Sequence, residues 1–278
     1  MNPAVHVRGL SKSYGRLPAV RDLDLDVESG EIFAILGPNG AGKTTTIEIL
    51  EGHRKRDSGQ VRVLGEDPGT AGRNWRANIG IVLQEVSDAG MLTVSETVQM
   101  FAKCYGKARL PEDVLDLVGL GSVSHSKVRT LSGGQRRRLD VALGIINLPK
   151  LVFLDEPTTG FDPEARRHFW DLIRLLAGDG TTFLLTTHYL EEAAALADRV
   201  AVIAEGRVVA VDSPQNLIKY VSSAATVKWR LGNKIHVEAT DHPTDLIRKW
   251  SADGTELAEL TVSRPTLEDA YLHLIGME

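Results

Sequence analysis

The chain has 278 residues, of which 42% are hydrophobic and 25% are charged, and its formal net charge at pH 7 is -5. This length fits one large domain with a smaller annex, and the composition excludes a disordered or fibrous chain. A negative net charge also argues against a general nucleic-acid binder, which normally carries a surplus of Lys and Arg.

Cys104 is the single cysteine, so no intramolecular disulfide and no cysteine-based zinc site can form. Its neighbours are apolar and aromatic, and we expect it to be a small buried residue rather than a reactive thiol. No stretch approaches the ~18 consecutive apolar residues of a membrane span, and residues 1–14 lack a signal-peptide core. These features predict a cytosolic chain.

The first predicted strands lie at residues 5–10 and 20–27, where apolar and polar residues alternate. Alternation indicates antiparallel strands with one solvated face. Further along, four short apolar runs are each followed by a loop and a helical pattern, which predicts a mostly parallel sheet with covering helices. These runs are residues 31–36, 79–83, 151–154 and 182–186.

A helical insertion is expected at about residues 86–148, between the second and third of these runs. Three segments there have helical periodicity and no strand pattern, namely residues 95–105, 111–118 and 133–147. Core packing onto this insertion is one explanation for the apolar residues of the segment 85–94. After it, residues 200–204 and 207–211 are β-rich, and Ser213 with Pro214 is a plausible helix start. We place the end of the first domain at residue 220.

Residues 221–278 are expected to form a small C-terminal α+β domain. Residues 226–231 and 234–239 flank Gly232 and Asn233, which predicts a hairpin turn. A helix at 244–250, a strand at 256–262 and a helix at 266–275 should follow.

Residues 37–45 contain a phosphate-binding motif. They are Gly37, Pro38, Asn39, Gly40, Ala41, Gly42, Lys43, Thr44 and Thr45, and the first eight match G-x-x-x-x-G-K-[ST] between a predicted strand and a predicted helix. The glycines let backbone N–H groups turn toward phosphate oxygens, and the helix N-terminus adds partial positive charge. Lys43 can bridge the β- and γ-phosphates, and Thr44 can ligate Mg²⁺. The pattern alone also covers kinases and GTPases.

Four further polar residues follow predicted strands. Asp155 and Glu156 end the run at 151–154, Gln84 ends the run at 79–83, and His188 follows the run at 182–186. The carboxyl ends of parallel strands share one edge, so these side chains should surround the same ligand. Asp155 would hold Mg²⁺, and Gln84 would sense Mg²⁺ and the attacking water. Glu156 would orient or deprotonate that water, with His188 on a γ-phosphate oxygen.

A second helix start offers another anion site. Leu131, Ser132, Gly133, Gly134 and Gln135 open the predicted helix at 133–147. Ser132 and Gln135 have capping-box spacing, which alone would explain them. Two glycines in the first turn weaken a helix, however, and favour close approach of the backbone to a phosphate. The three arginines at 136–138 are expected to form a solvated face.

Together these motifs resemble the nucleotide-binding domain of the ATP-binding-cassette superfamily over residues 5–220. The resemblance implies an α/β P-loop NTPase core with an antiparallel β subdomain, a helical insertion and the C-terminal appendage. It also implies a head-to-tail homodimer in which the LSGGQ signature at 131–135 caps the ATP of the opposing subunit. Tyr14 matches the aromatic residue that stacks on adenine. Gly160, Phe161 and Asp162 match a loop that contacts the opposite subunit, although Phe161 is unusual there.

The segment at 264–272, R-P-T-L-E-D-A-Y-L, is similar to the closing motif of ATPase subunits from the drug and antibiotic efflux branch, such as daunorubicin-resistance ATPases. Thr266 and Asp269 have capping-box spacing. The resemblance implies a Mg²⁺-dependent ATPase that drives a separate membrane permease, for export, from the cytoplasmic face of the membrane. It equally implies that residues 85–94 help to form the groove that receives a cytoplasmic helix of the permease. The alternatives are a soluble cassette ATPase acting on nucleic acid or ribosomes and a regulatory module that senses ATP.

Overall fold

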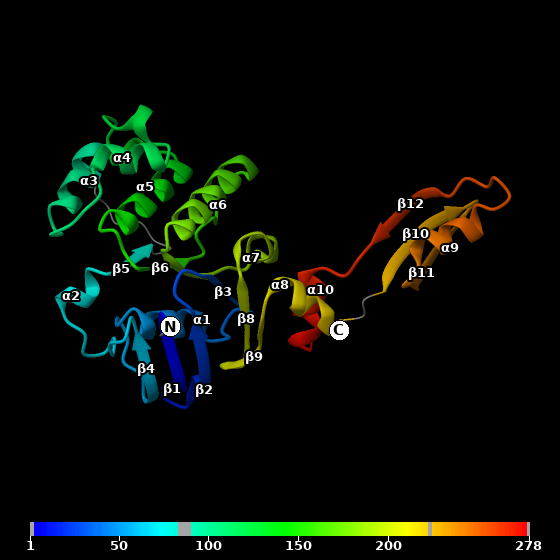
Figure 1. The fold of residues 1–278 in the computed structure, drawn as a ribbon, viewed down its shortest axis with the longest axis horizontal. Helices are drawn as coiled ribbons and strands as arrows, with labels where there is room; N and C mark the ends of the chain where they lie inside the picture. The colour runs from blue at the N-terminus through cyan, green and yellow to red at the C-terminus, as the bar shows by residue number, and fades with distance from the viewer. Residues whose placement is uncertain (1–2, 83–89, 222–223, 277–278) are drawn as a thin grey trace. The chain divides into compact units, whose positions relative to one another are not determined.

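The computed structural model describes residues 3–82, 90–221 and 224–276. Gln84 and the first half of the segment 85–94, residues 85–89, therefore lie outside the described residues. The chain divides into two compact units, Met1–Val211 and Asp212–Glu278 (Figure 1). The sequence placed the domain boundary at residue 220, and that boundary stays a prediction.

The first unit contains a six-stranded sheet in the order β5-β6-β7-β3-β8-β9. The five strands from β5 to β8 in this order are parallel, which confirms the predicted α/β class. Their bounds are β3 Ile32–Leu36, β5 Ile79–Val82, β6 Leu151–Asp155, β7 Thr182–Thr186, β8 Arg199–Ala204 and β9 Arg207–Asp212. Every residue of β3 and β7 is buried, as expected for strands with both faces covered.

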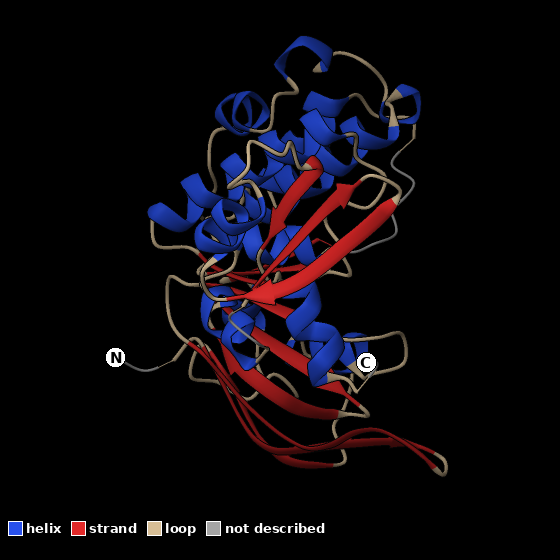
Figure 2. Cartoon of the chain, turned by 90° about the vertical axis from the view of Figure 1, so that its right-hand side faces the viewer, coloured by secondary structure: helices blue, strands red, loops and turns tan. Residues whose placement is uncertain are grey.

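A second sheet in this unit is antiparallel, in the order β2-β1-β4. Its strands are β1 Val5–Tyr14, β2 Leu17–Val27 and β4 Ser58–Val63, and the longer ones curve along the bottom of Figure 2. The sequence predicted the first two strands but not β4, whose first three residues, Ser, Gly and Gln, are all exposed. One apolar core joins the two sheets and includes Val7, Leu25, Val61 and Phe33.

Helices cover the parallel sheet and build the insertion. They are α1 Lys43–Leu50, α2 Arg73–Arg76, α3 Val94–Ala102, α4 Pro111–Leu117, α5 Gly133–Ile145, α6 Pro163–Gly178 and α7 Leu190–Leu196. Single 3₁₀ turns lie at Gly121–Val123 and Val128–Thr130. The three predicted helices of the insertion are confirmed as α3, α4 and α5. No helix in the described part of the chain is long and apolar enough to cross a membrane.

Cys104 is exposed, so the expectation of a buried thiol was wrong. The residue lies just beyond the C-cap of α3 at Lys103, where the chain turns away from the helix. Its Sγ donates to the carbonyl of Met100 at 3.5 Å. Apolar neighbours in sequence do not bury a residue that follows a helix end.

The second unit holds a three-stranded antiparallel sheet in the order β11-β10-β12. Its elements are α8 Pro214–Leu217, a 3₁₀ turn Ile218–Tyr220, β10 Ala225–Leu231, β11 Lys234–Thr240, α9 Pro243–Trp250, β12 Ala258–Ser263 and α10 Leu267–Leu274. A small core forms around Val227, Trp229 and Leu246. Thr266 and Asp269 form the predicted capping box of α10. The α+β appendage expected from the sequence is confirmed.

Candidate functional site

The phosphate-binding motif connects β3 to α1, as the sequence predicted (Figure 1). Gly37 and Gly42 are fixed by close backbone contacts, because a Cβ at either would lie 2.3 Å from a carbonyl oxygen, of Ile203 and Ala19 respectively. Gly42 also has φ 99°, in the left-handed region that favours glycine. The loop therefore keeps a shape in which its N–H groups can face an anion at the start of α1.

Lys43 is the first residue of α1 and is buried, with 8% of its surface exposed. Its Nζ donates to the carbonyls of Gly37 at 2.7 Å and Pro38 at 3.1 Å, so the side chain folds back over the loop. Burial lowers the pKa of Lys43, and the carboxylates of Glu156 and Asp155 partly oppose that shift. A buried ammonium group beside a ring of N–H donors is a strong site for a polyphosphate.

A cavity of about 280 Å³ lies at this loop. Its lining residues are Leu17, Ala19, Asn39, Gly40, Gly42, Lys43, Thr44, Thr45, Asp155 and Glu156. The phosphate-binding loop and the end of β6 therefore meet at one site, although more than a hundred residues separate them in the chain. This is the convergence at the carboxyl edge that the sequence predicted.

The two carboxylates at the end of β6, those of Asp155 and Glu156, have different hydrogen-bond partners. Asp155 accepts a hydrogen bond from the hydroxyl of Thr186, at the end of the neighbouring strand β7. Glu156 has φ 45°, which is rare for a residue with a side chain. Its Oε1 lies 3.3 Å from Nδ1 of His188, and its Oε2 accepts from the hydroxyl of Thr159 at 3.4 Å.

Tyr14 ends β1 and is 41% exposed. The guanidinium of Arg54 lies 5.2 Å from the ring centre, Lys12 Nζ lies 5.8 Å from it, and the phenol oxygen is 3.4 Å from Thr45 Oγ1. An exposed aromatic face next to the loop is available to stack on a flat ring. Gln84, expected beside the same site, lies outside the described residues.

The signature segment forms the predicted capping box. The N–H of Gln135 donates to Ser132 Oγ at 3.2 Å, and the N–H of Ser132 donates to Gln135 Oε1 at 3.0 Å. A Cβ at Gly133 or Gly134 would meet nothing within 4 Å in the described parts of the chain. The chain itself therefore gives these two positions no steric reason to be glycine, and none of the four residues 132–135 lines the cavity at Lys43.

The loop at residues 160–162, expected from the sequence to contact the opposite subunit, makes contacts within its own chain. Asp162 caps α6 by accepting from the N–H of Ala165 at 2.8 Å. Phe161 is buried and packs edge-on against Phe169, with ring centres 5.9 Å apart. The unusual phenylalanine is thus a packing residue within its own subunit.

The expectation that residues 136–138 form a solvated face was wrong for Arg137. This side chain is only 6% exposed, and it donates to the carbonyls of Asp155 and Pro157. Three arginines in a row project about 100° apart around a helix, so one of them meets the strand end against which α5 packs. Nothing in the local sequence indicates which of the three arginines this would be.

Comparison with known proteins finds relatives that match most of the chain. Residues 20–159 match the family model described as ABC transporter. The chain is 35% identical to the daunorubicin resistance ATP-binding protein DrrA2 of Streptomyces coeruleorubidus, over 98% of this chain and 95% of that protein. It is 36% identical to the Nod factor export ATP-binding protein I of Rhizobium sp. strain N33, over 99% and 98% of the two chains.

Solved structures agree with the fold. An ATP-binding subunit of an ABC transporter gives a TM-score of 0.71 at 26% identity, covering 78% of this chain and 92% of the other. A dimeric ATP-binding cassette in a post-hydrolysis state with ADP and Pi gives 0.68 at 25% identity, covering 75% and 98%.

Proposed function

Because the chain belongs to the ABC transporter family and is one of its ATP-binding, ATP-hydrolysing cassettes, we propose that it drives a separate membrane permease that exports small molecules. The observation that carries the proposal is the cavity that joins Lys43, Thr44, Asp155 and Glu156. The names of the relatives given above, for daunorubicin resistance and Nod factor export, support export as the direction. The working location would be the cytoplasmic face of the membrane.

Mg²⁺ is the metal that fits this cavity. The hydroxyl of Thr44 and the carboxylate of Asp155 both line it, and such oxygen donors are the ligands that Mg²⁺ prefers alongside phosphate oxygens. Asp155 is held in place by the hydroxyl of Thr186. When bound, the ion would neutralise charge on the β- and γ-phosphates.

The side chains of this protein would bind the phosphates, orient the attacking water and accept its proton. The ammonium group of Lys43 would leave its two loop carbonyls and bind phosphate oxygens. The carboxylate of Glu156 would orient the attacking water and accept its proton. His188, beside Glu156, would donate to a γ-phosphate oxygen and hold the carboxylate in line. Tyr14 would stack on the adenine ring.

The signature residues would act on the ATP of a second copy of the chain. Ser132–Gln135 present a capped helix N-terminus with two glycines that no contact in the described residues requires. Close approach of an anion bound by another subunit would explain them. The site would therefore be completed only in a head-to-tail homodimer.

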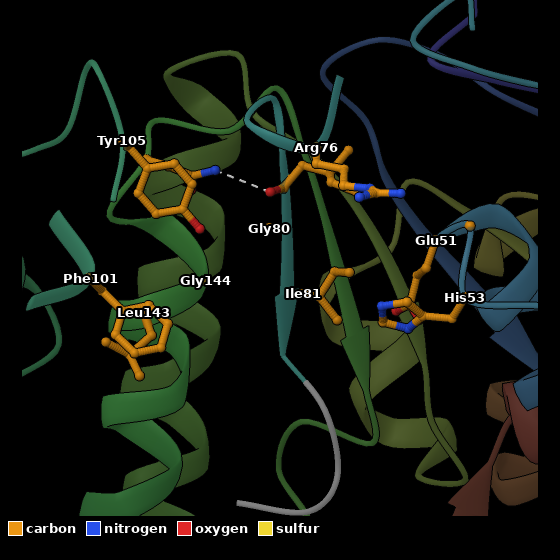
Figure 3. A pocket seen from close by; sticks show the side chains of 12 residues that line it. Glu51, His53, Arg76, Gly80, Ile81, Phe101, Tyr105, Leu143 and Gly144 are labelled. Atoms are coloured by element: carbon orange, nitrogen blue, oxygen red, sulfur yellow. Dashed lines mark hydrogen bonds and ion pairs between the residues drawn. The ribbon is translucent and has the colours of Figure 1, made fainter. Parts of the chain in front are cut away.

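A groove in the first unit is the proposed contact for the permease. It has a volume of about 480 Å³, and Figure 3 shows Phe101 and Tyr105 on one side of β5 and Glu51 and His53 on the other. Glu51 is 5% exposed, and burial, aided by the charges of Asp155 and Glu48, raises its pKa to about 8. The carboxyl group thus holds its proton near neutral pH, and a cytoplasmic helix of the permease that carries a hydrogen-bond acceptor would complement it.

The segment 85–94, expected near this groove from the sequence, is described only from residue 90 onward. Val94 is fully buried as the first residue of α3, whereas Met91 is 73% exposed. Val94 is thus a core residue, and Met91 remains available to a partner.

Affinity purification of the tagged chain from detergent-solubilised membranes tests the proposed function. We expect a polytopic membrane protein to co-purify in stoichiometric amount, and compounds exported by the complex to stimulate its ATPase activity. Recovery with ribosomes or nucleic acid, without a membrane protein, would contradict the proposal.

A further inference from the structure

Glu156 occupies a backbone conformation that needs outside support. Its φ of 45° lies in the left-handed region, which a glutamate adopts at a conformational cost. Glycine would adopt it freely, but glycine would have no carboxylate. The peptide groups on both sides of Glu156 must therefore be held by other contacts, or the side chain would move away from the cavity.

The backbone of Glu156 is itself bonded, because its N–H donates to the carbonyl of Thr186 at 3.1 Å and its carbonyl accepts from the N–H of Thr159 at 3.3 Å. The guanidinium of Arg137 adds contacts to the residues on either side. Its Nε donates to the carbonyl of Pro157 at 3.0 Å, and its Nη2 donates to the carbonyl of Asp155 at 2.6 Å. One planar group thus bonds the carbonyl of the residue before Glu156 and the carbonyl of the residue after it. Arginine suits this task because its N–H donors project in a fixed fork.

Arg137 is kept as a cation in a buried place. Burial lowers its pKa, and the nearby carboxylates of Asp140, Asp155 and Glu192 oppose that shift. Glu192 lies on α7, is fully buried and accepts from Trp170 Nε1 at 3.2 Å. A buried cation set among carboxylates and bonded to two carbonyls is a costly arrangement, which is unexpected for a residue that only fills space.

The neighbouring arginines behave differently. Arg138 Nη1 donates to the carbonyl of Gly119 at 3.0 Å, and Arg136 Nη2 lies 3.5 Å from the carbonyl of Val128. Both contacts lie within the helical insertion and are partly exposed. Arg137, by contrast, contacts the residues on either side of Glu156.

We propose that Arg137 is a positioning residue that clamps the carbonyls of Asp155 and Pro157, the residues on either side of Glu156, and so aims the Glu156 carboxylate at the attacking water. The clamp rests on the proposed role of Glu156. Arg137 lies on α5 shortly after the capping box of Ser132 and Gln135. In the proposed dimer, α5 would therefore serve both ATP sites. Its N-terminal signature would contact the ATP bound by the opposing subunit, and its Arg137 would position Glu156 beside the ATP bound by its own subunit.

Arg137→Lys and Arg137→Gln test the clamp, with Arg138→Gln as the matched control. Lysine keeps the charge near Asp140 and Glu192 but loses the fork, so this variant should fold. We expect kcat to fall about tenfold with lysine and about a hundredfold with glutamine, while the KM for ATP stays within about twofold. Arg138→Gln should keep the wild-type kcat.

Melting temperature and ATP affinity are measured on the same samples. A loss of kcat in the folded lysine variant, with ATP affinity unchanged, supports positioning. Wild-type kcat in Arg137→Lys and Arg137→Gln would overturn the clamp, as would a loss of ATP affinity that matches the loss of kcat.

Glu156→Gln, run in the same assay, separates this proposal from the proposed function. If Glu156→Gln is inactive and the Arg137 variants are fully active, only the clamp fails. If Glu156→Gln hydrolyses ATP normally, the role of Glu156 itself fails.

Discussion

His188 Nδ1 lies 3.3 Å from Glu156 Oε1, and the two residues follow neighbouring strands, β7 and β6. This pair joins the residue proposed to orient water with the residue proposed to contact the γ-phosphate. The imidazole is 46% exposed, and His188 reaches the cavity through Glu156, which lines it.

His188→Ala should lower kcat by about tenfold to a hundredfold, because Glu156 loses its neighbour and the γ-phosphate loses a donor. Affinity for ATP should change little, since the loop and Lys43 remain. Steady-state ATPase assays and equilibrium binding separate the two quantities. Tyr189→Phe is the control, because it keeps the aromatic ring whose centre lies 4.1 Å from the centre of the His188 ring. Wild-type kcat in His188→Ala would remove this residue from the mechanism.

Tyr14→Ala should weaken ATP binding by about tenfold, which matches a base-stacking contribution of about 1–3 kcal/mol. Tyr14→Phe should bind like the wild type, because the ring remains and only the contact with Thr45 is lost. Equilibrium titration with ATP measures both variants. An equal loss in the phenylalanine variant would show that the hydroxyl, and not stacking, carries the effect.

Glu51→Gln should stabilise the protein at alkaline pH. The folded-state pKa of Glu51 is about 8, above its ordinary value of 4.5, so the folded state retains a proton that the unfolded chain releases. Stability is therefore lost as pH rises from about 4.5 through 8, and glutamine removes that loss. We expect a gain of about 1–3 kcal/mol at pH 8.5 and little gain at pH 4.5.

Urea unfolding of the isolated chain at the two pH values measures the effect of Glu51→Gln. Glu66→Gln is the control, because the side chain of Glu66 is exposed. A gain that is the same at both pH values would contradict the assigned ionisation.

The meeting of Asp155, Glu156 and His188 at one sheet edge could be predicted from the sequence, because each lies within two residues of the end of an apolar run. A strand end fixes the direction and edge of the next side chain, so Asp155 and His188 needed no knowledge of distant contacts. The capping box of Ser132 and Gln135 could also be predicted, because both residues belong to the same helix start. Residues 37–44 could be recognised because they match a known phosphate-binding pattern.

The features that were missed depend on contacts between distant segments. The strand β4 pairs with β1 across the antiparallel sheet, and its polar residues gave no local signal. The burial of Arg137 depends on how α5 packs against the end of β6. The left-handed φ of Glu156 has no sequence signature either, since glutamate rarely adopts it.

The central claim is that each ATP site combines Glu156 of one subunit with Ser132 of another. The most direct test is the ATPase rate of an equimolar mixture of Glu156→Gln and Ser132→Arg chains, after dissociation and reassembly. Each variant alone should be inactive. Random pairing should give half heterodimers with one intact site each, so the mixture should recover about a quarter of the wild-type rate. A mixture as inactive as its components, or wild-type activity of Ser132→Arg alone, would contradict the composite site.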